Sequence, residues 1–183
     1  MTLTSLCLFC GSRPGSDAAF LPLAAAFGKL CADRGLRLVY GGGAHGLMGA
    51  APRAALAAGG EVVGILPRAL MTVEIAQAGL TELVVVAGLH ERKAEMFARS
   101  DAIVVLPGGI GTTDELFEVL TWRNLGLHAK PVFLLGGAFW QPFLDLLAHI
   151  DAQGFAYPGL SDLFEPLAGI AGLAERLASG QGR

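Results

Sequence analysis

Three observations predict an α/β fold, with a doubly wound and mainly parallel sheet flanked by helices. Short apolar runs rich in Val, Ile and Leu alternate along the chain with amphipathic segments. The runs mostly lack polar alternation, as expected for strands that are covered on both faces. The chain has 183 residues, which suits one domain and is too short for the eight strand–helix units of a TIM barrel. Residues 1–183 are therefore interpreted as a single Rossmann-like domain.

The expected elements follow in chain order. Strands are predicted at Leu3–Cys10, Leu36–Tyr40, Glu61–Leu66, Leu83–Val86, Ala102–Leu106 and Val132–Leu135. Helices are predicted at Asp17–Arg34, Gly46–Ala58, His90–Ala98, Thr113–Leu125 and Trp140–Ile150, with a last weak helix at Leu173–Ala178. Strand–helix–strand units of this kind make right-handed crossovers, and their sheets bind ligands beyond the carboxyl ends of the strands, where strand order reverses. The loops that directly follow strands are therefore the places to search for a site.

The composition excludes several classes of protein. Hydrophobic residues make up 53% of the chain and charged residues 16%, the opposite of a disordered protein. The net charge is −3 and the 13 basic residues are scattered, so neither a nucleic-acid partner nor a membrane anchor is expected. No uncharged run approaches the roughly 18–20 apolar residues of a membrane span. Because the chain begins without a basic, cleavable leader, a cytoplasmic location is expected.

The mean hydropathy of +0.55 is high for a small soluble monomer. Three large apolar residues, Phe117, Trp122 and Leu125, belong to the helix predicted over 113–125. A surface of this kind is normally covered by another copy of the chain. We therefore expect a homodimer.

The three cysteines are predicted to be ordinary buried thiols. Cys7 and Cys10 have CxxC spacing, but both lie in the first predicted strand, where residues three apart point to opposite faces and cannot chelate one ion. Cys31 lies in a helical stretch without a second CxxC. The four histidines show no metal-ligand spacing either, so no metal site is expected.

The strongest candidate for a ligand site is the loop that follows the fifth predicted strand. Glycines at 108, 109 and 111 remove every Cβ near the turn, and a helix is expected to begin at about Thr112. Exposed N–H groups and the positive end of the helix dipole suit a phosphate there. No Gly-Lys-Ser/Thr follows the glycines, which favours a monophosphate over a triphosphate with magnesium. Glu115 lies one turn into this helix, although Asp114 and Glu118 could equally serve as acids near its start.

Two further segments join this candidate site. Arg92 and Lys93 lie near the start of a helix, where the dipole disfavours cations, so an anion nearby is one explanation; balancing by Glu91 and Glu95 is another. Residues 41–46 satisfy GxGxxG after a strand, but the acidic residue expected about 20 positions on is missing, which disfavours NAD. Arg68 leaves a weak case for NADP. The simpler interpretation is a second glycine loop over the same small nucleotide.

These segments together resemble a known family. The motif over 107–115, PGGIGTTDE, preceded by HERK over 90–93, is quite specific. Further matching segments are Cys10-Gly11-Ser12, Tyr40–Gly43 with Gly46–Gly49, Glu74-Ile75-Ala76, Thr121-Trp122 and Leu125–Val132. From about residue 5 to 178 the chain resembles the LONELY GUY (LOG) family of cytokinin riboside 5′-monophosphate phosphoribohydrolases, often mislabelled as lysine decarboxylases.

The resemblance implies hydrolysis of the N-glycosidic bond of an N6-substituted adenosine 5′-monophosphate to a free base and ribose 5-phosphate. AMP itself is a further candidate substrate. The resemblance makes Arg92 and Glu115 the catalytic pair. It assigns substrate contacts to Ser12, Gly42, Gly43, Glu74, Lys93, Gly108, Gly109, Ile110, Gly111, Thr112, Thr113 and Thr121. It also implies a homodimer with sites near the subunit interface, and chemistry that needs neither a metal nor an organic cofactor.

Two alternatives remain at this point. A non-catalytic carrier of a nucleotide or of the molybdenum cofactor could use the same scaffold, but it would need the glycine loops without the pair Arg92 and Glu115. An NADP-dependent reductase is the other alternative. Lysine decarboxylation is rejected, because Lys29, Lys93 and Lys130 all lack a motif that would support pyridoxal phosphate.

Overall fold

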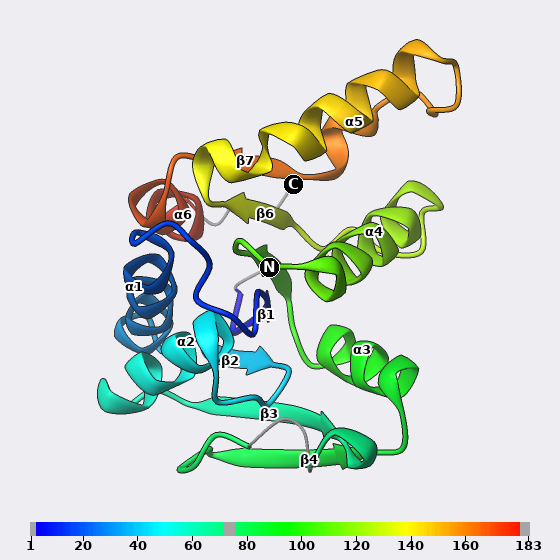
Figure 1. Cartoon of the computed structure of the whole chain (residues 1–183). Helices are drawn as coiled ribbons and strands as arrows, with labels where there is room; N and C mark the ends of the chain where they lie inside the picture. Colours follow the sequence, from blue (N-terminus) through cyan, green and yellow to red (C-terminus); the bar gives the residue numbers. More distant parts are fainter. Residues whose placement is uncertain (1–2, 72–75, 180–183) are drawn as a thin grey trace.

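The structure, a computed structural model, describes residues 3–71 and 76–179, and it confirms the α/β class (Figure 1). Within these residues the sheet has seven strands, all parallel, in the order β4-β3-β2-β1-β5-β6-β7. The strands are β1 (Ser5–Phe9), β2 (Arg37–Tyr40), β3 (Val62–Pro67), β4 (Glu82–Val86), β5 (Ala102–Val105), β6 (Val132–Leu135) and β7 (Glu165–Leu167). The α-helices are α1 (Phe20–Asp33), α2 (Gly46–Ala57), α3 (Leu89–Ala98), α4 (Ile110–Asn124), α5 (Gln141–Ala152) and α6 (Ile170–Ala178). Short 3-10 helices are η1 (Arg68–Leu70), η2 (Gly137–Trp140) and η3 (Leu160–Leu163).

Two apolar cores lie on the two faces of the sheet. Leu8 and Cys10 face a core with α1, α2 and α6, whereas Cys7 and Phe9 face a second core with α3, α4 and α5. Figure 1 shows these two groups of helices on opposite sides of the strands. Because both faces are covered, the central strands β1, β5 and β6 are buried along their whole length and are apolar except for Ser5, which is why their sequences show little polar alternation.

Strand order reverses beside β1. The chain runs outward from β1 through β2 and β3 to β4, and then returns to the other side of β1 with β5 before it continues to β6 and β7. The carboxyl ends of β1 and β5 therefore form the switch point at which such sheets bind ligands. The loops after these two strands are the glycine-containing segments at Gly11 and at 108–111.

Several elements differ from the predicted ones. Helix α1 begins at Phe20 instead of Asp17, α6 begins at Ile170 instead of Leu173, and the three 3-10 helices were not predicted. Two further differences concern the sheet edge and the glycine loop. β7 is absent from the prediction, because Glu165-Pro166-Leu167 is very short and contains a proline, which only an edge position tolerates. Helix α4 begins at Ile110 instead of at Thr113. Its N-cap is Gly109, whose extended backbone lets the helix start directly at the glycine loop.

The thiols lie where the strand pattern predicted them. Cys7 and Cys10 face different cores, and Cys31 is buried in α1; all three are free. Burial raises the pKa of the Cys31 thiol to about 12, and burial likewise raises those of Cys7 and Cys10. These thiols are therefore protonated and unreactive in the folded protein.

Among the described helices, none is both long and apolar enough to cross a membrane.

Candidate functional site

A cleft of about 480 Å³ opens at the switch point between β1 and β5. Its lining comes from the loop after β1, the loop between β5 and α4, and the start of α2. Single side chains of α1, α3 and η2 complete it. The lining residues are Cys10, Gly11, Ser12, Arg13, Pro14, Gly15, Phe20, Leu47, Met48, Arg92, Pro107, Gly108, Gly109, Ile110, Gly111, Thr112, Glu115 and Phe139.

Glycine is required where the two strand-end loops meet. The Gly11 N–H donates to the Pro107 carbonyl oxygen at 3.0 Å, which joins the loops directly. A Cβ on Gly108 would lie 2.0 Å from Thr112 Oγ1 and 2.8 Å from the Gly11 nitrogen. Because neither neighbour can move far, only a residue without a side chain allows this approach.

The start of α4 forms an anion cradle, by which we mean the backbone of residues 108–112. Helix starts leave N–H groups without helical partners, and the positive end of the helix dipole lies there. The N-cap, Gly109, has no side chain that could cap these groups. Thr112 is only 4% exposed and its side chain lines the cleft beside them. The cradle thus has the features that bind a phosphate.

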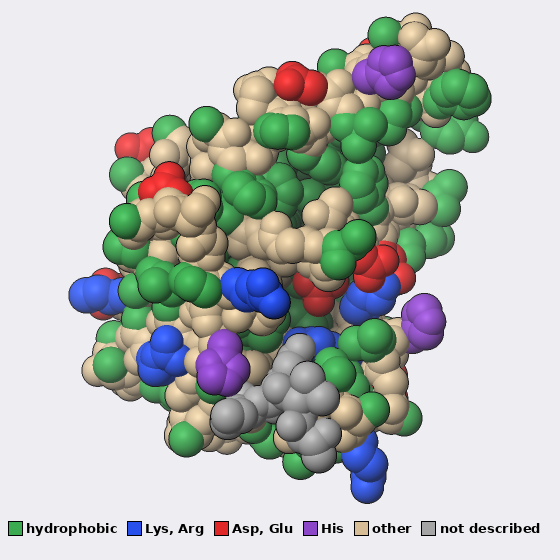
Figure 2. All heavy atoms as spheres, in the orientation of Figure 1, with side chains coloured by type: hydrophobic (Ala, Val, Ile, Leu, Met, Phe, Trp, Pro, Cys, Tyr) green, Lys and Arg blue, Asp and Glu red, His purple; other side chains and the backbone are tan. Residues whose placement is uncertain are grey.

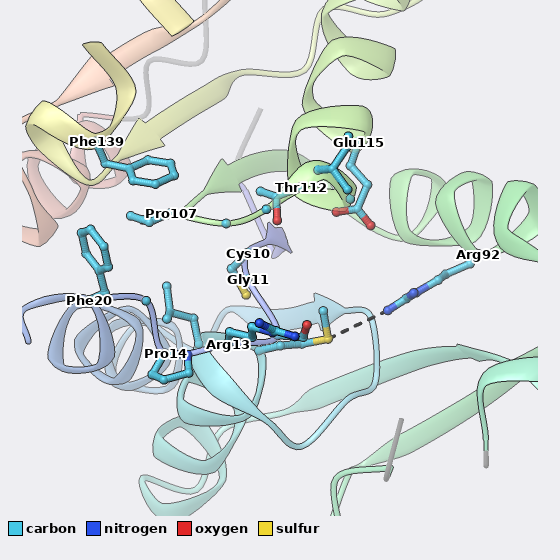
Figure 3. A pocket seen from close by; sticks show the side chains of 18 residues that line it. Cys10, Gly11, Arg13, Pro14, Phe20, Arg92, Pro107, Thr112, Glu115 and Phe139 are labelled. Carbon is cyan, nitrogen blue, oxygen red and sulfur yellow. Dashed lines mark hydrogen bonds between the residues drawn. The ribbon is translucent and has the colours of Figure 1, made fainter. Parts of the chain in front are cut away.

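Arg92 is a buried cation at one end of the cleft. It comes from α3, is 5% exposed, and donates from Nη2 to the Gly41 carbonyl oxygen at 2.6 Å. The same nitrogen lies 3.9 Å from the Met48 sulfur, the contact dashed in Figure 3. A Cβ on Gly41 would lie 2.0 Å from Arg92 Nη2. Gly41 therefore fixes the guanidinium twice, by its carbonyl group and by its missing side chain.

Glu115 lies at the same end of the cleft as Arg92. It projects from the first turns of α4, and Figure 3 shows its carboxylate directed toward the space that the Arg92 guanidinium also enters. The carboxylate influences the floor of the cleft as well. Burial has the largest effect in raising the pKa of the Cys10 thiol, and the negative charge of Glu115 has the second largest. Cys10 is therefore no nucleophile, and the ionic groups of this end are Arg92 and Glu115.

Figure 2 shows how the charges are distributed around the opening. Acidic and basic side chains gather between α3 and α4, whereas hydrophobic side chains dominate between α1 and α5. The close-up gives the same division, with Arg92 and Glu115 at one side of the cradle and Phe20 and Phe139 at the other (Figure 3). The cleft thus has an ionic end and an aromatic end, with the cradle between them.

Most of the residues selected from sequence lie together in this cleft. They are Ser12, Arg92, Gly108, Gly109, Ile110, Gly111, Thr112 and Glu115. Glu74 lies outside the described residues. The remaining five, Gly42, Gly43, Lys93, Thr113 and Thr121, do not line the cleft of this single chain.

Three of those five have side-chain contacts elsewhere. The Lys93 ammonium lies 3.0 Å from carboxylate oxygens of both Asp114 and Glu118, so it ties α3 to α4. Thr113 Oγ1 donates to the Gly109 carbonyl oxygen at 3.1 Å, and the exposed Thr121 donates to that of Phe117 at 2.7 Å. Their assignment as substrate contacts stays a prediction.

The glycine loop after β2 differs from the cradle in its contacts. Gly42 has a positive φ of 81°, and its carbonyl oxygen accepts from the Gln77 N–H at 3.0 Å. Gly43 forms an isolated antiparallel bridge with Ala76. This loop is thus clasped to the segment before β4, and it contacts the cleft through Gly41 and the buried Arg92.

Sequence reasoning missed several lining residues. Arg13 could have been found from the sequence, since it comes directly after Ser12 in the loop that follows the first strand. Phe20 and Phe139 could not, because they come from the start of α1 and from η2 after β6, and only the fold brings them together. Their rings lie 5.7 Å apart at 84°.

The described residues contain no group of three or more His, Cys, Asp or Glu side chains placed to hold a metal ion. The cleft lining also contains no lysine. Pyridoxal phosphate, which a lysine decarboxylase would use, needs a lysine for its Schiff base. The described lining therefore does not fit that cofactor.

Known proteins resemble this chain in sequence. A family profile described as "Possible lysine decarboxylase" matches residues 48–175. A cytokinin riboside 5′-monophosphate phosphoribohydrolase from Rhodococcoides fascians is 46% identical over 159 residues, which cover 86% of this chain and 80% of that protein. The enzyme of that name called LOG5, from Arabidopsis thaliana, is 40% identical over 173 residues, covering 94% of this chain and 76% of its own.

Solved structures share the fold at lower identity. The molybdenum cofactor binding protein from Rippkaea orientalis superimposes with a TM-score of 0.71 and 21% identity, covering 96% of this chain and 95% of that one. The molybdenum cofactor carrier protein from Chlamydomonas reinhardtii has a TM-score of 0.69 and 22% identity, covering 98% of each chain. At these identities the likeness is one of fold. The sequence matches, in contrast, are close and extend over most of the chain, which therefore belongs to the LONELY GUY family of cytokinin riboside 5′-monophosphate phosphoribohydrolases.

Proposed function

We propose that this protein hydrolyses the N-glycosidic bond of N6-substituted adenosine 5′-monophosphates, and of AMP, releasing the free base and ribose 5-phosphate. The observation that carries the proposal is that Arg92 and Glu115 both line the cleft that contains the anion cradle. The names of the relatives at 40–46% identity support the same reaction.

The cradle holds the 5′-phosphate in this proposal. The phosphate accepts hydrogen bonds from backbone N–H groups at the start of α4 and from the Thr112 hydroxyl. The bound phosphate then fixes the position of the ribose, so that binding energy is used to hold the reacting bond in place. A monophosphate fits this arrangement because the ionic end begins directly beside the cradle.

Glu115 acts on the ribose. When the glycosidic bond breaks, positive charge grows on the sugar ring in an oxocarbenium-like transition state. A carboxylate beside the ring stabilises that charge and orients a water molecule for attack on the anomeric carbon. The water adds its hydroxide to that carbon, and its proton leaves with the base, so that the products are the neutral base and ribose 5-phosphate.

Arg92 places a positive charge at the same end of the cleft as Glu115. Its guanidinium is held by Gly41 before any ligand arrives, so it loses little conformational freedom on binding. From there its fork faces an anionic nucleotide in the cleft. Burial makes this cation more effective than an exposed one, since solvent screens it less.

The test is an assay of base release. Purified protein is incubated with AMP and with isopentenyladenosine 5′-monophosphate, and the free base is quantified by chromatography. We expect release from the N6-substituted nucleotide, and we expect Glu115→Gln to lower kcat by about 100-fold or more while nucleotide binding persists. Glu118→Gln is the matched control on the same helix, because Lys93 keeps Asp114 as a partner. If the unaltered protein releases no base from either nucleotide, the proposal is wrong.

The carrier alternative gives the opposite result in this assay. A carrier would bind a nucleotide in the cradle and release no base. It also offers no reason for a buried arginine and a carboxylate at one end of the cleft. NADP binding has little support, because Arg68 lies in η1 and does not line the cleft.

We also propose that the protein is a homodimer. Of the side chains that sequence alone singled out, Phe117 and Trp122 pack against Phe143 and Phe97 within the chain, whereas Leu125 is 61% exposed. Further exposed apolar side chains lie at the ends of α3 and α4 and in the turn after α4, namely Leu89, Ile110 and Leu127. A second copy would cover this surface. Light scattering after size-exclusion chromatography tests the proposal, and a monomer at micromolar concentration would contradict it.

A cytoplasmic location is proposed on the state of the thiols. All three cysteines are free and buried, which suits a reducing compartment. Fractionation of cells that produce the protein checks this, and recovery in the secreted fraction would exclude it.

A further inference from the structure

The cleft continues past the anion cradle to an aromatic wall that the proposed reaction does not use. The wall consists of Phe20 at the start of α1 and Phe139 in η2, whose rings meet edge to face at 5.7 Å. Both side chains line the cleft, together with Pro14 and Pro107. In Figure 3 this end lies on the opposite side of the cradle from Arg92 and Glu115.

Core packing does not explain Phe139. Its ring belongs to neither of the two apolar cores and is 39% exposed. It is nevertheless held in place on two sides, edge-on by Trp140 at 5.0 Å and by Phe20. An aromatic face that is rigid and open to a cleft is suited to stacking against a flat ring of a ligand.

The same cleft is also lined by a cation, Arg13. Arg13 follows the glycine loop after β1, is exposed, and lines the cleft. Within the described residues no hydrogen bond or ion pair of its guanidinium is formed, in contrast to Lys93, which is bound to two carboxylates. Arg13 is therefore available for a second negative charge next to the one in the cradle.

We propose that the aromatic wall binds a ring carried on the far side of the 5′-phosphate, so that the cleft also accepts nucleoside diphosphate esters. In this arrangement the first phosphate lies in the cradle, the second meets Arg13, and the second ring stacks on Phe139. The proposal rests on the proposed function, because that function places the ribose at the ionic end. It concerns binding, and its test needs no turnover.

The experiment compares three ligands by titration calorimetry. AMP has one phosphate, ADP-ribose is a diphosphate ester without a second base, and diadenosine diphosphate adds that base at the same charge. Glu115→Gln is the parent protein, so that the ligands stay intact, and a titration of the unaltered protein with the two esters checks their ranking. We expect diadenosine diphosphate to bind about tenfold more tightly than ADP-ribose, the effect of one stacked base.

Two variants locate the effect. Phe139→Ala should remove the advantage of diadenosine diphosphate and leave AMP binding unchanged, whereas Phe155→Ala, at a phenylalanine that is 83% exposed and outside the cleft, should change neither. Arg13→Ala should weaken both esters relative to AMP. Equal affinity for the two esters in the parent would overturn the proposal, as would an equal loss of AMP and ester binding in Phe139→Ala.

The two proposals fail in different ways. If the calorimetry gives the expected ranking and the unaltered protein releases no base, the aromatic wall is a binding site and the proposed hydrolysis is wrong. If base release occurs and the ranking is absent, the hydrolysis stands alone. A loss in Phe139→Ala that is larger for isopentenyladenosine 5′-monophosphate than for diadenosine diphosphate would place the N6 substituent at the wall and would also contradict the inference.

Discussion

The two glycine-rich loops of this protein have similar sequences and different positions relative to the switch point. The loop at 108–111 follows β5, lies on the reversal of strand order, and lines the cleft along its whole length. The loop at 41–43 follows β2, one strand further out, and is clasped by Gln77 and Ala76. Only its first glycine acts on the site, through Arg92. Sheet position, more than glycine content, decides which loop holds a ligand.

Gly108→Ala tests the cradle with the largest expected effect. The new Cβ would overlap Thr112 Oγ1 and crowd the Gly11 nitrogen, so the two loops must separate. We expect overpacking to lower the free energy of unfolding by about 1–3 kcal/mol. Displacement of the cradle should lower kcat/KM by about 100-fold, because small misplacements are costly in catalysis. Denaturant unfolding measures the loss of stability, and the affinity for ribose 5-phosphate measures the displacement of the cradle. An unaltered affinity would show that the cradle does not hold the phosphate.

Gly41→Ala tests the indirect role of the other loop. Its Cβ would displace the Arg92 guanidinium from a distance of 2.0 Å without touching the cradle. We expect kcat to fall by about 100-fold while ribose 5-phosphate still binds. Steady-state kinetics alongside calorimetry separates the two quantities. A variant that loses phosphate binding as completely as Gly108→Ala would remove the distinction between the loops.

Gly42→Ala should affect stability alone. Its φ of 81° belongs to the left-handed region, so a side chain costs about 1–2 kcal/mol of unfolding free energy. Gly42 does not line the cleft, so turnover per folded molecule should match that of the unaltered protein. Chemical denaturation and the base-release assay measure the two effects. A large loss of kcat in the folded variant would bring this glycine into the site, as the family resemblance implies.

Gly111→Ala has the smallest expected effect. Nothing lies within 4 Å of a Cβ at this position, which is inside the first turn of α4. Alanine favours a helix over glycine, so the unfolding free energy should rise by about 0.5–1 kcal/mol. Thermal unfolding without ligand measures the change. A marked destabilisation would mean that the start of α4 is more crowded than its contacts show.

The sequence predicted most of what lies at the switch point. The cradle and Glu115 share one short segment, and Arg92 lies near the start of the preceding helix, so local patterns marked both segments. The choice of Glu115 over Asp114 and Glu118, and of Arg92 as its partner in catalysis, came from the family resemblance. What the sequence could not show depends on long-range contacts. Gly41 holds Arg92 although the two residues are 51 positions apart in the sequence. Phe20 contacts Phe139 only because α1 and η2 flank the same strand ends. Residues 165–167 form a strand through pairing with β6 and not through their own composition.

The buried cysteines provide a way to watch this protein open. Cys10 is 4% exposed and lines the cleft, whereas Cys31 is on the buried face of α1, in the core and away from the cleft. A thiol reagent can reach either sulfur only during transient opening, so its rate of reaction measures how often that part of the molecule unfolds. A ligand in the cleft should therefore slow the labelling of Cys10 more than that of Cys31. The native thiols then report occupancy of the cleft by mass spectrometry, with no added probe.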